Sequence, residues 1–240
     1  MVQNTLHQNI IDRDSVFVVM PAKDEAPRVG KVINGILANG YKNVIVVNDG
    51  SMDQTEAISS NLGAIVLNHP INLGPGAATQ TGIAFALQMG AKVVVTIDSD
   101  DQHKSSDIDK LVGRLLETNA DFVIGSRFLK ESNEIPKQRI FYNKVGNFIT
   151  YLLTGLKVSD SQSGMKAFKA EFAEKWELTC NGFEFCIEII WHAQHHNAVI
   201  EEVPIHVTYT AETMSKGQNI LSGFRMLGRL VRSFCFPSSR

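Results

Sequence analysis

Three carboxylates occur within four residues, directly after an apolar run of the sequence. The run Val93–Ile97 leads into Asp98, Asp100 and Asp101, and Gln102 follows them. Carboxylates this close repel one another unless a cation or a proton relieves the repulsion. Carboxylate and amide oxygens are hard ligands that suit Mg²⁺ or Mn²⁺, ions that also bind substrate phosphates. The cluster therefore predicts a divalent-metal site at Asp98, Asp100 and Gln102, with an acid-rich helix N-terminus as the structural alternative.

Polar side chains also follow two earlier apolar runs. The first run ends in Pro21, Lys23 and Glu25, which can contact a ligand, although Glu25 can equally cap a helix. The second run ends in Asp49, followed by the turn residue Gly50. A carboxylate at position 49 can accept hydrogen bonds from the N–H groups of a nucleobase. These positions therefore predict ligand contacts, with turn formation and capping as the alternatives.

A glycine-containing loop, NLGPGA at residues 72–77, precedes a segment rich in small residues. Glycines ahead of a helix can bring backbone N–H groups against a phosphate. The loop matches neither the dinucleotide-binding glycine motif nor a Walker A loop. Close packing of a helix on a sheet explains its glycines nearly as well, so both interpretations remain open.

The elements that must position these groups alternate between strand and helix over the first 126 residues. Short runs rich in β-branched residues are typical of strands buried on both faces of a parallel sheet. These runs are Val16–Met20, Val44–Val47, Ala64–Leu67, Val93–Ile97 and Phe122–Ile124, with helical segments at 27–39, 53–62, 76–90 and 107–118. The alternation predicts an α/β fold with a doubly wound, mostly parallel central sheet flanked by helices. In such sheets ligands bind beyond the carboxyl ends of the strands.

The pattern is less regular beyond residue 126. We expect a surface loop at Leu129–Arg139, helices near 140–155 and 183–197, a strand at Val199–Pro204 and a second loop at Tyr209–Asn219. No segment has the composition of an interdomain linker. Residues 1–219 are therefore expected to form one domain, followed by a helix within 220–240.

The C-terminal segment 220–240 has the pattern of a basic amphipathic helix. Its apolar residues recur at spacings of four and three from Ile220 to Phe234, and 214–240 holds five basic and no acidic residues. Such a helix either closes the core of the domain or lies on an anionic membrane surface. The two roles are compatible if one end packs on the domain and the other contacts lipid.

The overall composition excludes some classes of protein. The formal net charge of the 240 residues is −2, without the basic excess expected of a nucleic-acid binder. No apolar stretch approaches the roughly 20 residues that span a bilayer, and the polar N-terminus lacks a signal-peptide pattern. The three cysteines fit no zinc or disulfide spacing. We therefore expect a cytoplasmic protein, peripheral on the cytoplasmic face of a membrane.

Taken in order, the motifs resemble family 2 glycosyltransferases of the GT-A fold. The most similar branch is that of the dolichyl-phosphate mannose synthases and polyprenyl-phosphate glycosyltransferases. The resemblance covers about residues 16–217 and rests on PAKDE (21–25), NDGSMD (48–53), NLGPGAA (72–78), DSDDQH (98–103) and VIGSRF (123–128). The segments DSQSGMK (160–166), GFEF (182–185), EEVP (201–204) and SKGQ (215–218) are also similar to that branch.

The resemblance implies metal-dependent transfer of a hexose, with inversion, from a GDP- or UDP-sugar to a polyprenyl phosphate such as dolichyl or undecaprenyl phosphate. The implied donor contacts are Pro21, Lys23, Glu25, Asp49, Asp98 and Ser99, and the implied metal ligands are Asp98, Asp100 and Gln102. Arg127 and Arg139 would bind the acceptor phosphate, although an isolated arginine can equally be a surface ion-pair residue. The residues implied in catalysis are Asp100, Arg127 and Lys216.

The sequence departs from the usual pattern of that family at three positions. Asn48 replaces the first acid of an acidic pair, Pro75 stands where a basic residue is common, and Asp101 adds a charge that can tighten metal binding or cap a helix. The first two departures leave the preferred donor base open.

The acceptor side lacks the Glu-Asp pair that supplies a general base in many relatives with hydroxyl acceptors. A phosphate monoester is already anionic near pH 7 and needs no base, so this absence favours a lipid-phosphate acceptor. A second hypothesis keeps the donor but uses a saccharide or other hydroxyl acceptor, with Glu184 or Glu188 as base unless these two form a solvated helix face. A third is a nucleotide-sugar-binding module without turnover.

Overall fold

The computed structural model describes residues 12–129 and 135–209. The expected catalytic residue Lys216 and the predicted helix within 220–240 lie outside the described residues. The same is true of part of the predicted loop at 129–139.

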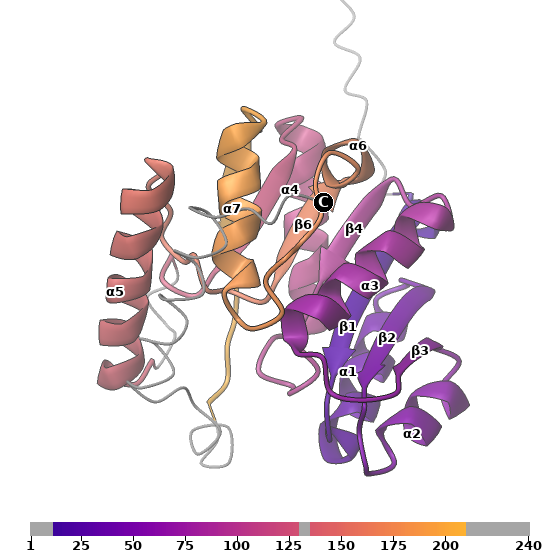
Figure 1. The fold of residues 1–240 in the computed structure, drawn as a ribbon. Coiled ribbons are helices and arrows are strands. Elements are labelled where there is room, and N and C mark those ends of the chain that lie inside the picture. The colour runs from indigo at the N-terminus through magenta and orange to yellow at the C-terminus, as the bar shows by residue number, and fades with distance from the viewer. Residues whose placement is uncertain (1–11, 130–134, 210–240) are drawn as a thin grey trace, which may run out of the picture.

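The described residues form a seven-stranded, mostly parallel sheet (Figure 1). Its strand order is β3-β2-β1-β4-β6-β5-β7. The strands are β1 (Val16–Ala22), β2 (Asn43–Asp49), β3 (Ile65–His69), β4 (Val93–Thr96), β5 (Phe122–Ser126), β6 (Lys166–Lys169) and β7 (Ile200–Pro204). Each strand predicted from an apolar run is present, and the expected doubly wound α/β architecture is confirmed.

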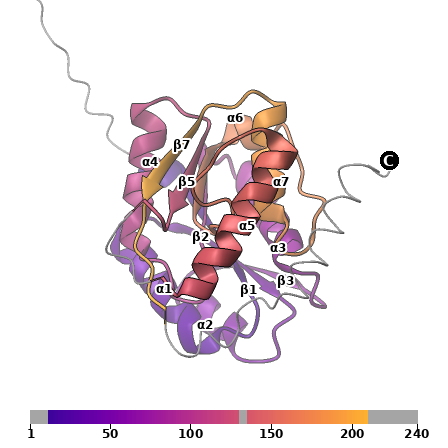
Figure 2. The same cartoon turned by 90° about the vertical axis from the view of Figure 1, so that its left-hand side faces the viewer.

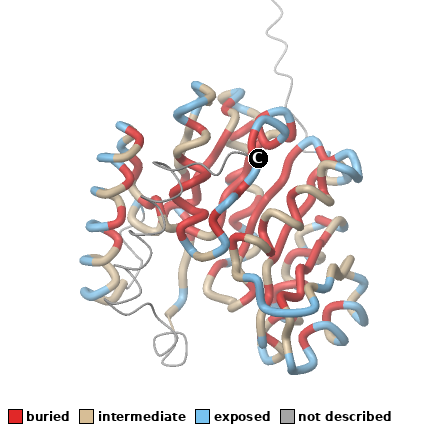
Figure 3. The backbone as a smooth tube through the Cα atoms, in the orientation of Figure 1, coloured by how far each residue is buried: buried red, intermediate tan, exposed pale blue. Residues whose placement is uncertain are grey.

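Helices cover both faces of the sheet. One face packs against α1 (Ala26–Ala38), α2 (Thr55–Asn61) and α4 (Ile108–Glu117), and the other packs against α3 (Pro75–Gln88), α6 (Ala170–Ala173) and α7 (Phe185–His195). The central strands are buried along their length, whereas each helix buries one side (Figure 3). Burial of both sheet faces explains why the strand sequences show no polar alternation.

One helix, α5 (Lys137–Thr154), lies outside this layered arrangement and contacts α7 (Figure 1). The sequence predicts that this helix starts near residue 140, directly after a loop that ends at Arg139. In the structure the helix begins at Lys137, so Arg139 lies in its first turn. Pro136 immediately precedes the helix, where the fixed φ of proline is compatible with a helix start.

The short strand β6 is absent from the sequence prediction. It consists of four residues, KAFK, and runs antiparallel between β4 and β5. Lysine at each end conceals the strand pattern, yet Lys166 is completely buried. Only the neighbouring strands, distant in sequence, make this segment part of the sheet.

The polar segments that follow β1, β2 and β4 meet at one edge of the sheet. Ala22 at the end of β1 pairs with Asn48 of β2, and Val19 pairs with Thr96 at the end of β4. The carboxyl ends of these strands therefore bring residues 21–25, 48–53 and 98–103 together, which is the expected location for ligand binding.

None of the helices described here combines the length and the apolar composition that crossing a bilayer requires.

Candidate functional site

A cleft of about 530 Å³ opens at the carboxyl edge of the sheet. Every predicted site residue within the described part of the chain lines it: Pro21, Lys23, Glu25, Asp49, Asp98, Ser99, Asp100, Gln102, Arg127 and Arg139. The structure thus brings the predicted donor, metal and acceptor residues to one site. Their individual roles stay predictions.

The loop after β4 carries the two carboxylates of the cleft. Burial and the charge of Asp98 raise the pKa of Asp100. Burial also opposes ionisation of Asp98, but the hydrogen bond and charge of His103, with the charges of Lys166 and Arg127, lower its pKa. His103 Nε2 lies 3.4 Å from Asp98 Oδ2. A cation beside Asp98 and Asp100 would therefore favour the state in which both carboxylates are ionised.

Gln102 supports Asp100 from the same loop. Its backbone N–H donates to Asp100 Oδ1 at 3.1 Å, and its side-chain amide donates to Oδ2 at 2.5 Å. The extra acid, Asp101, does not line the cleft and instead forms a 2.5 Å ion pair with Lys31 of α1. Asp101 thus interacts with α1 rather than with a ligand in the cleft.

Gly164 is the residue against which Asp98 packs. A Cβ atom at position 164 would lie 2.1 Å from Asp98 Oδ2, which is far inside van der Waals contact. The backbone of the segment before β6 therefore approaches the carboxylate as only glycine allows. Thr96 of β4 fixes the same segment, because its hydroxyl donates to the Gly164 carbonyl at 2.8 Å.

The two carboxylates fit a hard divalent cation, although the described residues contain no cluster of three or more His, Cys, Asp or Glu side chains arranged around a metal position. Asp98 and Asp100 offer oxygen ligands at the open cleft, and burial together with the charge of Asp98 raises the pKa of Asp100, which a bound cation would oppose. Mg²⁺ and Mn²⁺ sites of this kind commonly complete their coordination with water and substrate phosphates. Gln102 stays a predicted ligand.

Asp49 binds the glycine-containing loop before α3. Its two carboxylate oxygens accept the backbone N–H groups of Leu73 and Gly74, each at 2.8 Å. His69 Nδ1 also lies 2.8 Å from Asp49 Oδ1. Asp49 therefore holds residues 72–74 at the wall of the cleft, and its predicted contact with a base would use oxygens that already accept hydrogen bonds.

The same loop packs closely on a distant segment. A Cβ at position 76 would lie 1.9 Å from the carbonyl oxygen of Cys180, and the Gly76 N–H donates to the Asn181 carbonyl at 2.8 Å. At the next turns of α3, a Cβ at Gly82 would lie 2.3 Å from Val19 Cγ1. These contacts favour the packing interpretation of the glycines over phosphate binding.

Lys23 and Glu25, two predicted donor contacts, are held in place at the cleft by neighbouring residues. Lys23 Nζ donates to Asp24 Oδ2 at 2.7 Å and to the Gly50 carbonyl at 2.8 Å. Glu25 forms a 2.6 Å ion pair with Arg28 of α1. The segments after β1 and β2 are thus joined by direct contacts.

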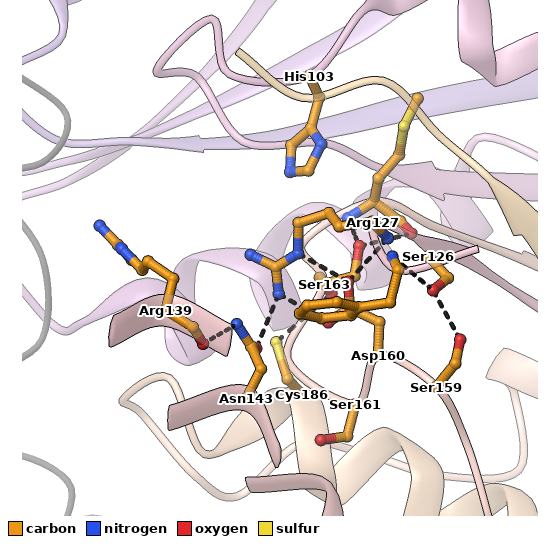
Figure 4. Close-up of polar contacts among 12 residues, drawn as sticks. His103, Ser126, Arg127, Arg139, Asn143, Ser159, Asp160, Ser161, Ser163 and Cys186 are labelled. Atoms are coloured by element: carbon orange, nitrogen blue, oxygen red, sulfur yellow. Dashed lines mark hydrogen bonds and ion pairs between the residues drawn. The ribbon is translucent and has the colours of Figure 1, made fainter. Parts of the chain in front are cut away.

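Arg127, at the end of β5, is held by a buried acid (Figure 4). Its Nε donates to Asp160 Oδ2 and its Nη2 to Asp160 Oδ1, both at 2.7 Å, while Nη2 also lies 3.1 Å from Asn143 Oδ1. The Asp160 side chain is completely buried. Although burial alone would lower it, the charge and hydrogen bonds of Asp160 raise the pKa of Arg127. Arg127 is therefore a fixed cation of the cleft wall.

Arg139 reaches the cleft from the first turn of α5. Its guanidinium carbon lies 5.9 Å from the centroid of the Tyr209 ring, and its carbonyl accepts the Asn143 side-chain amide at 2.9 Å. Asn143 consequently connects the two arginines (Figure 4).

Neither Glu184 nor Glu188, the general bases considered for a hydroxyl acceptor, lines the cleft. Glu184 and Glu188 are almost completely buried, so the prediction of a solvated helix face is wrong. Glu188 accepts hydrogen bonds from the Thr179 backbone and hydroxyl and from the Cys180 N–H, at 2.6–2.9 Å. Glu188 organises the loop before α7 and is not placed to deprotonate a ligand in the cleft.

Three residues that shape this site carry no predicted role in the sequence motifs. His103 fits no zinc-binding pattern in the sequence, yet it lines the cleft beside Asp98. Asp160 and Lys166 belong to the DSQSGMK segment, which was quoted for the family resemblance without a role. Buried charge in that segment, at Asp160 and Lys166, is what connects it to the cleft.

Comparison with known proteins agrees with this geometry. Residues 17–176 match the family model described as glycosyl transferase family 2. The chain is 34% identical to the UDP-N-acetylglucosamine–dolichyl-phosphate N-acetylglucosaminyltransferase of Methanococcus voltae, covering 90% of this chain and 94% of that protein. It is 28% identical to the polyprenol monophosphomannose synthase of Mycolicibacterium smegmatis, covering 85% of this chain and 82% of that protein.

The fold is similar to that of a solved glycosyltransferase. Glucosyl-3-phosphoglycerate synthase from Mycobacterium tuberculosis, crystallised with Mn²⁺, UDP and phosphoglyceric acid, superimposes with a TM-score of 0.70 at 20% identity, covering 93% of this chain and 80% of that one. The Rossmann-like sheet with its flanking helices is the GT-A fold. The chain therefore belongs to glycosyl transferase family 2, and the protein is a GT-A glycosyltransferase.

Proposed function

We propose that this glycosyltransferase transfers a hexose, with inversion, from a nucleotide-diphosphate sugar to a polyprenyl phosphate in a metal-dependent reaction. The observation that carries the proposal is the joint position of an acidic pair, Asp98 and Asp100, and a fixed cation, Arg127, in one cleft. The acids and the cation would serve different substrates, the donor and the acceptor. A donor diphosphate needs a cation held by acids, whereas an acceptor phosphate needs basic side chains.

The proposed reaction forms one bond and breaks one. An acceptor phosphate oxygen attacks the anomeric carbon of the sugar, and the bond between that carbon and the donor diphosphate breaks. The electron pair leaves with the nucleoside diphosphate. Asp98 and Asp100 would hold a divalent ion, which would supply Lewis-acid stabilisation of the charge that develops on this leaving group. Lys216 is proposed to contact phosphate as well.

The acceptor side of the cleft supports a phosphate rather than a hydroxyl acceptor. Arg127 and Arg139 lie at the cleft wall, joined through Asn143, and are proposed to bind the acceptor phosphate. A hydroxyl acceptor would need a base near its oxygen, but Glu184 and Glu188 do not line the cleft. The names of the M. voltae and M. smegmatis relatives also specify lipid-linked acceptors.

The donor is proposed to bind along Pro21, Lys23, Glu25, Asp49 and Ser99. The M. voltae relative is named for a UDP-sugar, and the structural neighbour contains UDP with Mn²⁺, which supports a UDP-sugar over a GDP-sugar. The active protein is proposed to act at the cytoplasmic face of a membrane, where both substrate types would meet.

The proposal is tested by incubating the full-length protein with UDP-N-acetylglucosamine, UDP-glucose or GDP-mannose, Mn²⁺ and a short-chain polyprenyl phosphate. Mass spectrometry should detect a polyprenyl phosphosugar, and EDTA should abolish its formation. Transfer to the dephosphorylated polyprenol at an equal rate would support a hydroxyl acceptor. Tight donor binding by calorimetry, with no product from any acceptor, would support a binding module.

A further inference from the structure

Helix α5 has the reverse of the usual amphipathic arrangement. The residues that it buries most fully are small or polar, namely Asn143, Gly146, Thr150 and Thr154. The half-buried Leu153 adds one large apolar contact with the core. Its opposite side carries large apolar residues at positions i, i+4, i+7 and i+11. We call this side, Phe141, Val145, Phe148 and Leu152 with the adjacent Tyr151, the α5 apolar face.

The α5 apolar face is exposed. Phe141, Phe148 and Leu152 are 64%, 60% and 65% exposed, and Val145 and Tyr151 are also largely accessible. The helix lies across the outside of the molecule, with the length of its outer surface visible in Figure 2. A row of large apolar side chains on one continuous surface marks an interaction site, unlike single exposed apolar residues.

The charges of α5 indicate the kind of partner. The helix contains Lys137, Arg139 and Lys144 and no aspartate or glutamate. Lys137 and Lys144 are exposed alongside the apolar residues. An apolar stripe bordered by basic residues is complementary to an anionic lipid surface, where the apolar side chains enter the acyl boundary and the basic ones meet headgroups.

The same helix forms part of the cleft. Gln138, Arg139, Tyr142 and Asn143 line it, and these residues share the first two turns of α5 with Phe141. The predicted phosphate ligand Arg139 is therefore only two residues from the α5 apolar face. If the α5 apolar face contacted lipid, the cleft would therefore lie beside the headgroup layer.

We propose that the α5 apolar face docks on an anionic membrane surface and so places the cleft at the depth of a lipid phosphate. This inference deepens the proposed function, because it rests on the acceptor being a lipid. It assigns membrane contact to a described helix of the catalytic domain, in addition to the contact predicted for 220–240. The polyprenyl chain would remain in the bilayer while its phosphate enters the cleft along α5.

The test compares two double variants of the full-length chain, so that the C-terminal segment is present in both. Phe141→Ser with Phe148→Ser removes two members of the α5 apolar face. The control, Met89→Ser with Val199→Ser, removes two exposed apolar residues at the other edge of the sheet. Flotation is measured with vesicles of phosphatidylcholine, alone and mixed with phosphatidylglycerol.

The wild type and the control are expected to bind the anionic vesicles equally. The α5 variant should bind at least about tenfold more weakly, because it loses two inserted aromatic side chains. Equal vesicle binding by all three proteins would overturn the proposal. So would a lower melting temperature of the α5 variant without a change in vesicle binding, because another segment of the chain would then cover the face. Conversion of a dimer to a monomer, with vesicle binding unchanged, would identify a second copy as the partner instead.

Two further measurements keep the test decisive. Brominated lipids should quench the fluorescence of the tryptophan introduced by Phe148→Trp more than that of the one introduced by Met89→Trp. Equal quenching would contradict insertion of α5. Sugar transfer to a short polyprenyl phosphate in detergent should be the same for the α5 variant and the wild type. If the wild type binds vesicles through α5 but transfers no sugar in detergent, the proposed function fails and the docking surface stands.

Discussion

Asp160 holds the guanidinium of Arg127 by a two-point ion pair, with both N···O distances at 2.7 Å. Asp160 also accepts the Arg127 backbone N–H at 3.0 Å. An acid with no exposed side-chain surface thus fixes both the main chain and the side chain of the proposed phosphate ligand. If Arg127 binds the acceptor phosphate as proposed, Asp160 acts through Arg127 and is a positioning residue.

Replacing Asp160 should therefore affect the acceptor more than the donor. In Asp160→Asn the fork of Arg127 loses its charged partner, and we expect the KM for polyprenyl phosphate to rise at least about tenfold, with a smaller change in the donor KM. Asp121→Asn is the control, because Asp121 lies away from the cleft, where it forms a 3.9 Å, partly exposed pair with Lys169 and accepts the Val199 N–H at 2.9 Å. Equal effects on both KM values would contradict the positioning role.

Asp160→Asn is also expected to be less stable than the wild type, because breaking a buried ion pair costs on the order of 3–5 kcal/mol. A double variant, Arg127→Met with Asp160→Leu, separates folding from function. Apolar replacement of both partners should restore much of the stability lost in Asp160→Asn. Sugar transfer should remain low, since the cation is missing, and recovered transfer would show that the pair is structural.

Neighbouring acids on the loop after β4 should respond differently to the same substitution. Asp100→Asn removes a proposed metal ligand and should lower transfer about 100-fold or more, and EDTA should cause little further loss. Asp101→Asn should retain near-wild-type transfer, because Asp101 pairs with Lys31 outside the cleft and asparagine tolerates its positive φ of 60°. Steady-state rates with Mn²⁺ titration measure both. Equal loss in the two variants would remove the metal role of Asp100.

Three glycine-to-alanine substitutions should separate activity from stability. Gly164→Ala should displace Asp98 and lower transfer with a small change in melting temperature. Gly82→Ala should cost about 1–3 kcal/mol of unfolding free energy, because its Cβ would overlap Val19 of the sheet. Gly113→Ala in α4 meets no atom within 4 Å and should stabilise the protein by about 0.5–1 kcal/mol. Urea unfolding and transfer assays on the same preparations provide the comparison, and a loss of stability without loss of transfer in Gly164→Ala would contradict the proposed Asp98 contact.

Glu188→Gln should affect folding and leave the chemistry intact. The carboxylate accepts three hydrogen bonds from residues 179 and 180, and an amide can accept at only one of its two ends. We expect a loss of about 1–3 kcal/mol in unfolding free energy. Transfer per folded molecule should stay near the wild-type value. Loss of transfer at full stability would instead return Glu188 to consideration as a base.

The pattern of apolar runs in the sequence was sufficient to predict the edge of the sheet that carries the cleft and every strand except β6. Buried parallel strands such as β1 and β2 are continuous apolar runs, and topology alone brings their polar ends together. The same reasoning could not find β6, because Lys166 and Lys169 suggest solvent and only pairing with β4 and β5 buries this strand. It could not reveal the reversed α5 either, since an apolar stripe does not state which side of a helix faces the protein.

The site was predicted at the level of residues but not of contacts. Asp98, Asp100 and Arg127 were identified from their order in the motifs. The partner of Arg127 lies 33 residues away in the sequence, and no spacing rule joins the two. The position of Asp49 after its strand predicts contact with a nucleobase, whereas in the structure both of its oxygens accept hydrogen bonds from the chain.

The antiparallel direction of β6 determines how the two halves of the cleft are connected. Because β6 runs against β4 and β5, its leading segment, rather than its trailing one, arrives at the edge where those strands end. Asp160 and Gly164 lie on this one segment, so five consecutive residues contact both Arg127, the proposed acceptor ligand, and Asp98, the proposed donor and metal ligand. If the two substrates bind as proposed, this short stretch of chain sets the distance between them. An insertion within 160–164 would therefore be expected to shift Arg127 and Asp98 at once.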